Sequence, residues 1–133
     1  MPDQCVLQLT STLSQEELVF GFMSFSQAYY GVKSFPLFTD PSWHKFMYFV
    51  SMELRHLLPP SFDIEFEWNA LHPLICGRED ISFALAIVAI IDSSTQRMWL
   101  SGDGEWGQKL SKQFPDLAYE MVKLSREVRG FIS

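Results

Sequence analysis

An apolar run followed by a polar break constrains the fold of this chain more than any other feature. Residues 81–91 read Ile-Ser-Phe-Ala-Leu-Ala-Ile-Val-Ala-Ile-Ile and carry no charge. Residues 92–96 are polar, and the run at 97–100 is again β-prone. Two such runs on either side of a turn are typical of a β-hairpin. We therefore predict a central hairpin over residues 81–101.

A helix is the alternative for residues 81–91, because periodicity cannot separate a buried strand from a buried helix. Ala and Leu favour the helix, whereas the Ile and Val content and the polar break favour the strand. In a strand, alternate bulky side chains would share the face that we expect to meet the core: Ile81, Phe83, Leu85, Ile87 and Ile91. Smaller side chains would share the opposite face: Ser82, Ala84, Ala86, Val88 and Ile90.

The length of 133 residues suits one compact domain over 1–133, and the 47% hydrophobic content argues against disorder. The formal net charge is −6, so we expect no binding to nucleic-acid phosphates or anionic membrane surfaces. The uncharged run is also shorter than the roughly 20 residues of a membrane-spanning helix. No motif indicates a cofactor.

The two cysteines, Cys5 and Cys76, form no disulfide framework, and the N-terminus lacks the pattern of a signal peptide. Neither cysteine lies in a motif that would activate its thiol, so a buried thiol is the default for each. We therefore expect a cytoplasmic protein with free thiols.

Two helices are predicted before the hairpin. Residues 14–17 form a capping box, which predicts a helix over 15–30 that ends at Gly31. Asp40-Pro41 opens the second helix, and Pro59-Pro60 stops it. The first helix carries a strip of small residues where another helix could approach closely: Gly21, Ser24 and Ala28. We expect the apolar linker 32–39 between the helices to pack against the rest of the protein or to add an edge strand.

Residues 61–68 alternate apolar and acidic side chains, which predicts a strand. A loop is expected over 69–80, and a short first strand over 5–9. Helices are expected over 105–113 and from 115 to about 130, after the Gly-rich exit from the hairpin. The element order (β)ααβββα(α) predicts an α+β fold. Its antiparallel sheet has three or four strands, with two N-terminal helices and a C-terminal helical segment.

The segment Gly102-Asp-Gly-Glu-Trp-Gly107 matches the G-x-G-x-x-G pattern of dinucleotide-binding sites. That site needs a following parallel strand in a βαβ unit, and here the chain continues only with helix. Asp103 and Glu105 would also repel a pyrophosphate. We therefore interpret the segment as a Gly-rich exit from a strand.

Three carboxylates share one face of the predicted strand at 61–68: Asp63, Glu65 and Glu67. Residues 61–80 carry five acids and one arginine, a net charge of −4. A solvated face is the simplest interpretation, a protein-binding surface is the next, and catalysis or metal binding the last. No histidine lies at a convincing ligand spacing from these acids. We expect structural roles for all three histidines: His44, His56 and His72.

If the strands lie side by side, one sheet face carries the three acids, then small residues, then Arg97 and Trp99, with Trp106 nearby. We predict a non-enzymatic interaction protein that uses this acidic and aromatic face. It could be an assembly factor, an inhibitor or immunity-type protein, or a subunit. Its partner would be another protein, steered by charge if it is basic, or a second copy of the chain.

Two alternatives to this function stay open. The abundance of Phe and Met could line an apolar pocket between helices and sheet, as in a small-molecule-binding or sensory domain. An enzyme is the third hypothesis, for which the sequence offers only scattered carboxylates and histidines.

Overall fold

The computed structural model describes residues 12–69, 71–102 and 104–127. Its elements follow in the order α2 (Gln15–Tyr30), β1 (Phe35–Pro36), α3 (Pro41–Glu53), a 3-10 turn (Arg55–Leu57), β2 (Phe66–Trp68), β3 (Pro73–Ile75), α4 (Arg78–Val88), β4 (Ala89–Asp92), β5 (Arg97–Leu100), α5 (Glu105–Gln113) and α6 (Pro115–Glu127). The fold is α+β, as the sequence predicts. The expected first strand at 5–9, and the last helix beyond residue 127, fall outside the described residues.

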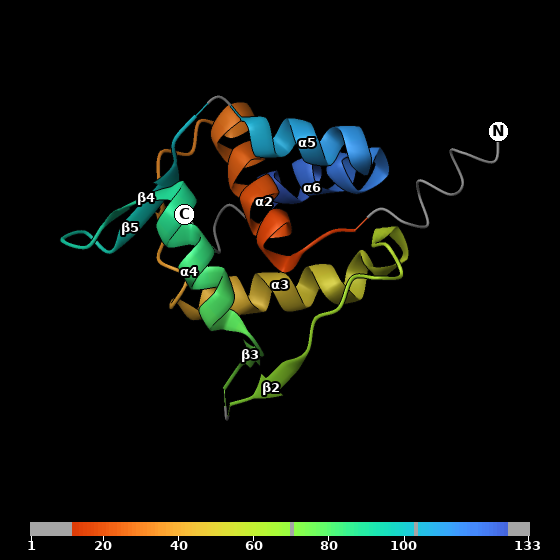
Figure 1. Cartoon of the computed structure of the whole chain (residues 1–133), viewed down its shortest axis with the longest axis horizontal. Coiled ribbons are helices and arrows are strands. Elements are labelled where there is room, and N and C mark those ends of the chain that lie inside the picture. Colours follow the sequence, from red (N-terminus) through yellow and green to blue (C-terminus); the bar gives the residue numbers. More distant parts are fainter. Residues whose placement is uncertain (1–11, 70, 103, 128–133) are drawn as a thin grey trace.

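Helix α2 is the centre of the helical layer, with α5 and α6 on one side and α3 on the other (Figure 1). It begins at the predicted capping box, in which Ser14 Oγ accepts from the Glu17 amide at 3.1 Å. The Glu17 carboxylate accepts from the Ser14 amide at 3.3 Å. The helix ends at Gly31 in the left-handed conformation. Both predicted ends of the helix are therefore confirmed.

The small-residue strip of α2 allows α5 to approach closely, as predicted. A Cβ added to Gly21 would lie 2.7 Å from Leu110 Cδ2. A Cβ added to Gly107 of α5 would lie 2.9 Å from Ser24 Oγ. Glycine on both helices therefore sets the distance between them.

The strands form two separate antiparallel sheets, one in the order β1-β5-β4 and the other made of β2 and β3. In the first sheet, Ala89 to Asp92 pair with Leu100 to Arg97, around a turn where Asp92 Oδ1 accepts from the Ser94 amide at 3.1 Å. The predicted sidedness of residues 97–100 is confirmed, since Met98 and Leu100 are buried. Strand β1 pairs with β5 and supplies the edge strand expected within 32–39.

The first half of the predicted hairpin is wrong, because residues 81–88 belong to helix α4 and only β4 is extended. Gly77 is left-handed at the start of the helix, and two acids in the first turn favour its N-terminus. Ile81 and Leu85 are buried at the i, i+4 spacing of a helix, whereas Phe83 and Ile87 are exposed. The bulky residues therefore do not share one core-facing side.

The predicted strand over 61–68 is hydrogen-bonded as a strand only at Phe66–Trp68. Its side chains still alternate from Ser61 to Glu67: those of Phe62, Ile64 and Phe66 are half-buried, and the acids between them are exposed, whereas Trp68 is exposed as well. Its partner β3 lies inside the expected loop 69–80, where Pro73 and the shortness of the strand concealed it.

A cluster of aromatic rings fills the space between α2, α3 and the first sheet. The ring centroids of Phe22 and Phe46 are 4.2 Å apart, and Trp43 lies 5.9 Å from Phe35. The side of α3 that faces away from this cluster is open, since Phe49 and Met52 are 45% and 56% exposed. The second helix is therefore covered on one side and open on the other.

Candidate functional site

The acidic and aromatic sheet face predicted from the sequence does not form. It requires residues 61–68 to lie in the same sheet as residues 97–101, but β2 and β5 belong to different sheets. The small residues expected between them, Ser82, Ala84 and Ala86, lie on helix α4. The candidate residues are therefore divided between two regions of the molecule.

The cationic and aromatic half of the predicted site is engaged in structural contacts. Arg97 donates from Nε to Ser34 Oγ at 3.0 Å and from Nη2 to the Ser34 carbonyl at 2.8 Å. Trp99 is half-buried on β5. The ring of Trp106 lies 4.8 Å from that of Phe20. These contacts account for Arg97 and Trp106 within the fold.

The acidic half of the site is exposed. Asp63, Glu65 and Glu67 point to solvent along the segment that leads into and through β2. Glu67 pairs with Arg78 at 2.8 Å. Within the described residues, Asp63 and Glu65 have no ion-pair partner, so their charge is available to a second molecule.

One edge of β2 is open. In the described part of the chain its one hydrogen-bonded neighbour is β3. The Cys76 amide donates to the Glu65 carbonyl at 2.8 Å, and the Asn69 amide to the His72 carbonyl at 3.1 Å. Every second residue of an antiparallel strand bonds to the same neighbour. The backbone groups that point to the open edge therefore belong to the residues between: Ile64, Phe66 and Trp68.

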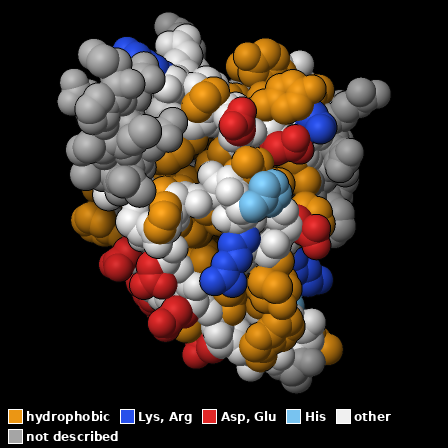
Figure 2. Space-filling view, turned by 90° about the vertical axis from the view of Figure 1, so that its right-hand side faces the viewer, with side chains coloured by type: hydrophobic (Ala, Val, Ile, Leu, Met, Phe, Trp, Pro, Cys, Tyr) orange, Lys and Arg blue, Asp and Glu red, His pale blue; other side chains and the backbone are white. Residues whose placement is uncertain are grey.

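A groove of about 340 Å³ runs between the C-terminal half of α3 and residues 58–66. Its walls include Tyr48, Met52, Arg55, Phe62, Ile64 and Phe66. Ile64 and Phe66 thus contribute both to the groove and to the open strand edge. Figure 2 faces this end of the molecule and shows one group of hydrophobic side chains near the bottom of the view, with acidic side chains along the lower left flank.

A cluster of three aromatic rings lies beside the groove. The Tyr48 ring is 5.2 Å from both the Phe66 and Trp68 rings, at near-perpendicular angles to each. Trp68 is nevertheless 64% exposed. Sequence reasoning missed Tyr48 and placed Trp68 only on a strand face. The signal was present in the residue types, because Trp and Tyr are enriched among the residues that dominate binding energy at interfaces.

Two of the three histidines come together, which their places in the sequence did not reveal. The rings of His44 and His72 are 6.5 Å apart. His44 is buried, and its Nδ1 accepts from the Ile75 amide at 3.1 Å, which ties α3 to β3. Burial lowers the pKa of His44, with further contributions from the charges of Arg78 and His72. The predicted structural role fits this neutral, hydrogen-bonded ring.

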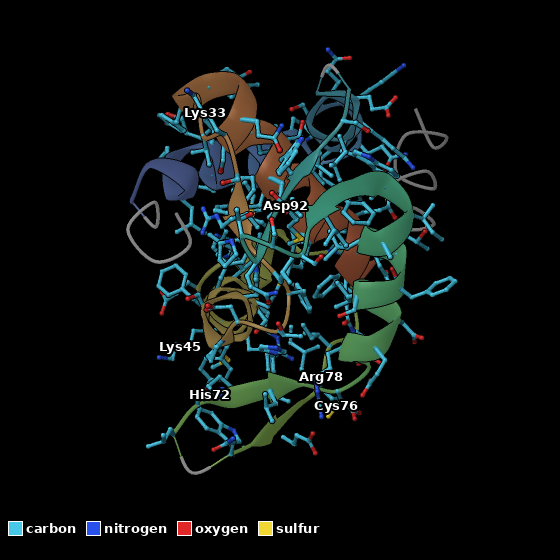
Figure 3. The ribbon with its side chains drawn as sticks, turned by 90° about the vertical axis from the view of Figure 1, so that its left-hand side faces the viewer. Lys33, Lys45, His72, Cys76, Arg78 and Asp92 are labelled. Atoms are coloured by element: carbon cyan, nitrogen blue, oxygen red, sulfur yellow. The ribbon has the colours of Figure 1, made fainter. Side chains whose placement is uncertain are left out.

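Figure 3 shows His72, Cys76 and Arg78 around the β2–β3 end of the molecule. Among the described residues, no group of three or more His, Cys, Asp or Glu side chains could hold a metal ion. The Gly-rich segment 102–107 follows β5, which pairs with β4 in antiparallel orientation and so does not open a βαβ unit.

None of the helices in the described ranges combines the length and the apolar character needed to cross a bilayer. Comparison with known proteins identifies no family: no family model matches the chain, and no curated protein or solved structure is significantly similar to it.

Proposed function

We propose that this protein is a non-enzymatic interaction module that binds an extended, basic segment of a partner protein. The segment lies in the groove beside α3 and adds a strand to the open edge of β2. The observation that carries the proposal is this edge, with the groove on one side and unpaired carboxylates along it.

Strand addition supports the proposal through backbone chemistry. An extended peptide can satisfy the outward amide and carbonyl groups of Phe66 and Trp68, while its alternate side chains enter neighbouring pockets. The groove offers such a pocket, walled by apolar side chains together with Ser51, Arg55 and Asp63. The exposed indole of Trp68 provides the large contact area that often dominates binding energy.

Charge supports a basic partner. Asp63 and Glu65 are exposed and lack an ion pair among the described residues, and the whole chain carries a net charge of −6. A segment with Lys or Arg at alternate positions would be steered to this edge, and salt would weaken the encounter. Arg55 in the groove wall offers one site for a carboxylate of the same partner.

The test is selection of peptides from a random display library on the immobilised full chain at low salt. We expect the enriched peptides to be basic and to bind more weakly as salt is raised. The double variant Asp63→Lys, Glu65→Lys should weaken binding by about tenfold or more. Trp68→Ala should do the same without changing the charge.

Two variants serve as matched controls for this selection. Glu105→Lys changes the charge of an exposed residue on α5, and Tyr119→Ala removes an exposed ring on α6. Both should bind the selected peptides as the wild type does. Enrichment of neutral or acidic peptides, or equal binding by the Asp63 and Glu65 variant, would contradict the proposal.

A small-molecule-binding domain is the second candidate, and one cavity favours it. A pocket of about 390 Å³ lies between α2, the end of β5 and the start of α5, lined in part by Ser24, Gln27, Leu100 and Trp106. A ligand bound there would raise the melting temperature of the native protein. Thermal-shift screening of metabolites, with Gln27→Ala as the comparison, separates this candidate from peptide binding.

A further inference from the structure

A second surface, distinct from the β2 edge, exposes large apolar side chains on α4 and β4. Phe83 and Ile87 are 71% and 70% exposed, and they share one face of α4 at the i, i+4 spacing. Ile90 and Ile91 of β4 are 45% and 44% exposed. These four residues form what we call the α4–β4 face. Figure 3 shows side chains of α4 directed away from the body of the protein.

The size of this face exceeds that of isolated surface hydrophobics. A large apolar side chain has on the order of 200 Å² to bury, so the four together expose about 460 Å². That lies within the roughly 300–600 Å² of the largest patch on a typical monomer, which is often functional. It is more than half of the ~800 Å² that each partner contributes to a standard interface, and the remainder comes from its margins, such as the exposed Ala86.

The charge distribution indicates which kind of molecule covers the α4–β4 face. Residues 81–91 carry no charge, although the chain as a whole carries −6. Two copies of so acidic a protein repel each other over most of their surfaces. Contact through the α4–β4 face lessens this repulsion, because its four residues are apolar in each copy and Glu79, one turn before Phe83 on α4, lies at the margin of the contact.

The sheet geometry agrees with pairing of like surfaces. Strand β4 is an edge of the three-stranded sheet, so a second copy that packs along this edge can contact both Ile90 on one sheet face and Ile91 on the other. The β4–β5 hairpin projects from the body beside α4 (Figure 1). A twofold axis beside this hairpin would pair the α4–β4 face of one copy with the same face of the other. Such a dimer is closed, because both copies of the face are used.

From these observations we infer that the protein forms a twofold homodimer in which the α4–β4 face of one copy packs against the same face of another. The dimer buries Phe83 and Ile87 at its centre. It leaves the β2 edge of each copy free, so the inference does not depend on the peptide-binding proposal.

The test is sedimentation equilibrium of the full chain across the micromolar concentration range. We expect twice the monomer mass at high concentration for the wild type. Phe83→Glu and Ile87→Glu should each raise the dissociation constant by about tenfold or more, since they place charge at the interface centre. Tyr119→Glu, on α6, is the matched control and should dimerise as the wild type does.

Circular dichroism checks that each variant is folded, and the truncations Phe83→Ala and Ile87→Ala repeat the test without adding charge. The Asp63→Lys, Glu65→Lys variant should remain dimeric, which separates this result from failure of the peptide-binding proposal. A wild type that stays monomeric at every concentration overturns the inference. A dimer that is insensitive to the changes at both Phe83 and Ile87 overturns it as well.

Discussion

The amide of Gly107 donates a hydrogen bond to Ser24 Oγ at 3.1 Å, which joins α5 to α2 at their closest approach. A Cβ on Gly107 would lie 2.9 Å both from that oxygen and from Phe25 Cε1. We expect Gly107→Ala to destabilise the protein by about 1–3 kcal/mol through overpacking, despite the better helix propensity of Ala. Urea denaturation measures the difference.

Gly21→Ala is the informative comparison for that variant. Its Cβ would meet Leu110 Cδ2, the end of a side chain that can rotate away. We expect a smaller loss of stability at Gly21 than at Gly107, and almost none for Gln108→Ala on the exposed face of α5. A greater loss at Gly21 than at Gly107 would contradict this explanation of the packing.

Gln27 takes the place of a neighbouring strand at the end of β5. Its Nε2 donates to the Leu100 carbonyl at 3.2 Å, and its Oε1 accepts from the Leu100 amide at 2.8 Å. Gln27→Ala leaves both backbone groups without this partner, so we expect a loss of about 1–3 kcal/mol. Thermal unfolding, with Gln108→Ala as control, measures it; equal melting temperatures for the two variants would refute the expectation.

Stability should decrease in mild acid because of His44. Burial, then the charges of Arg78 and His72, lower the pKa of His44 below its ordinary value of 6.5. The unfolded chain therefore binds a proton more readily than the folded one. The stabilisation is fully present above pH 6.5 and is lost as the pH falls from there through the lowered pKa.

Urea midpoints at about pH 7.5 and about pH 5.5 measure this loss, because the two values bracket the ordinary histidine pKa. The variant His44→Asn keeps a hydrogen-bond acceptor near the Ile75 amide, but its side chain does not titrate. We expect His44→Asn to reduce the difference between the two midpoints. A difference of the same size in the variant and the wild type would show that another group causes it.

The elements with local chemical signals were predictable from the sequence. The capping box at Ser14, the Asp40 cap of α3 and the Asp92 turn each depend on side chains bonding to nearby backbone, and all three occur as expected. The close approach of α5 at Gly21 was also anticipated. In each case a few adjacent residues, or a strip on one helix, determine the structure.

The α4 segment was mispredicted because its helical pattern is hidden. All residues from Ile81 to Ile91 except Ser82 are apolar, so the buried pair Ile81 and Leu85 cannot be distinguished from the exposed pair Phe83 and Ile87. The division of the strands into two sheets depends on tertiary packing of β3 against α3. That packing separated Trp99 from the acids and placed Tyr48 beside Trp68 instead.

Amide hydrogen exchange along β2, followed by NMR with and without a selected basic peptide, tests strand addition most directly. In the free protein, the Phe66 and Trp68 amides should exchange rapidly, and the Glu67 and Asn69 amides slowly, since only the latter face β3. The bound peptide should protect Phe66 and Trp68. If they stay unprotected while the peptide is bound, the open edge of β2 is not where the partner pairs.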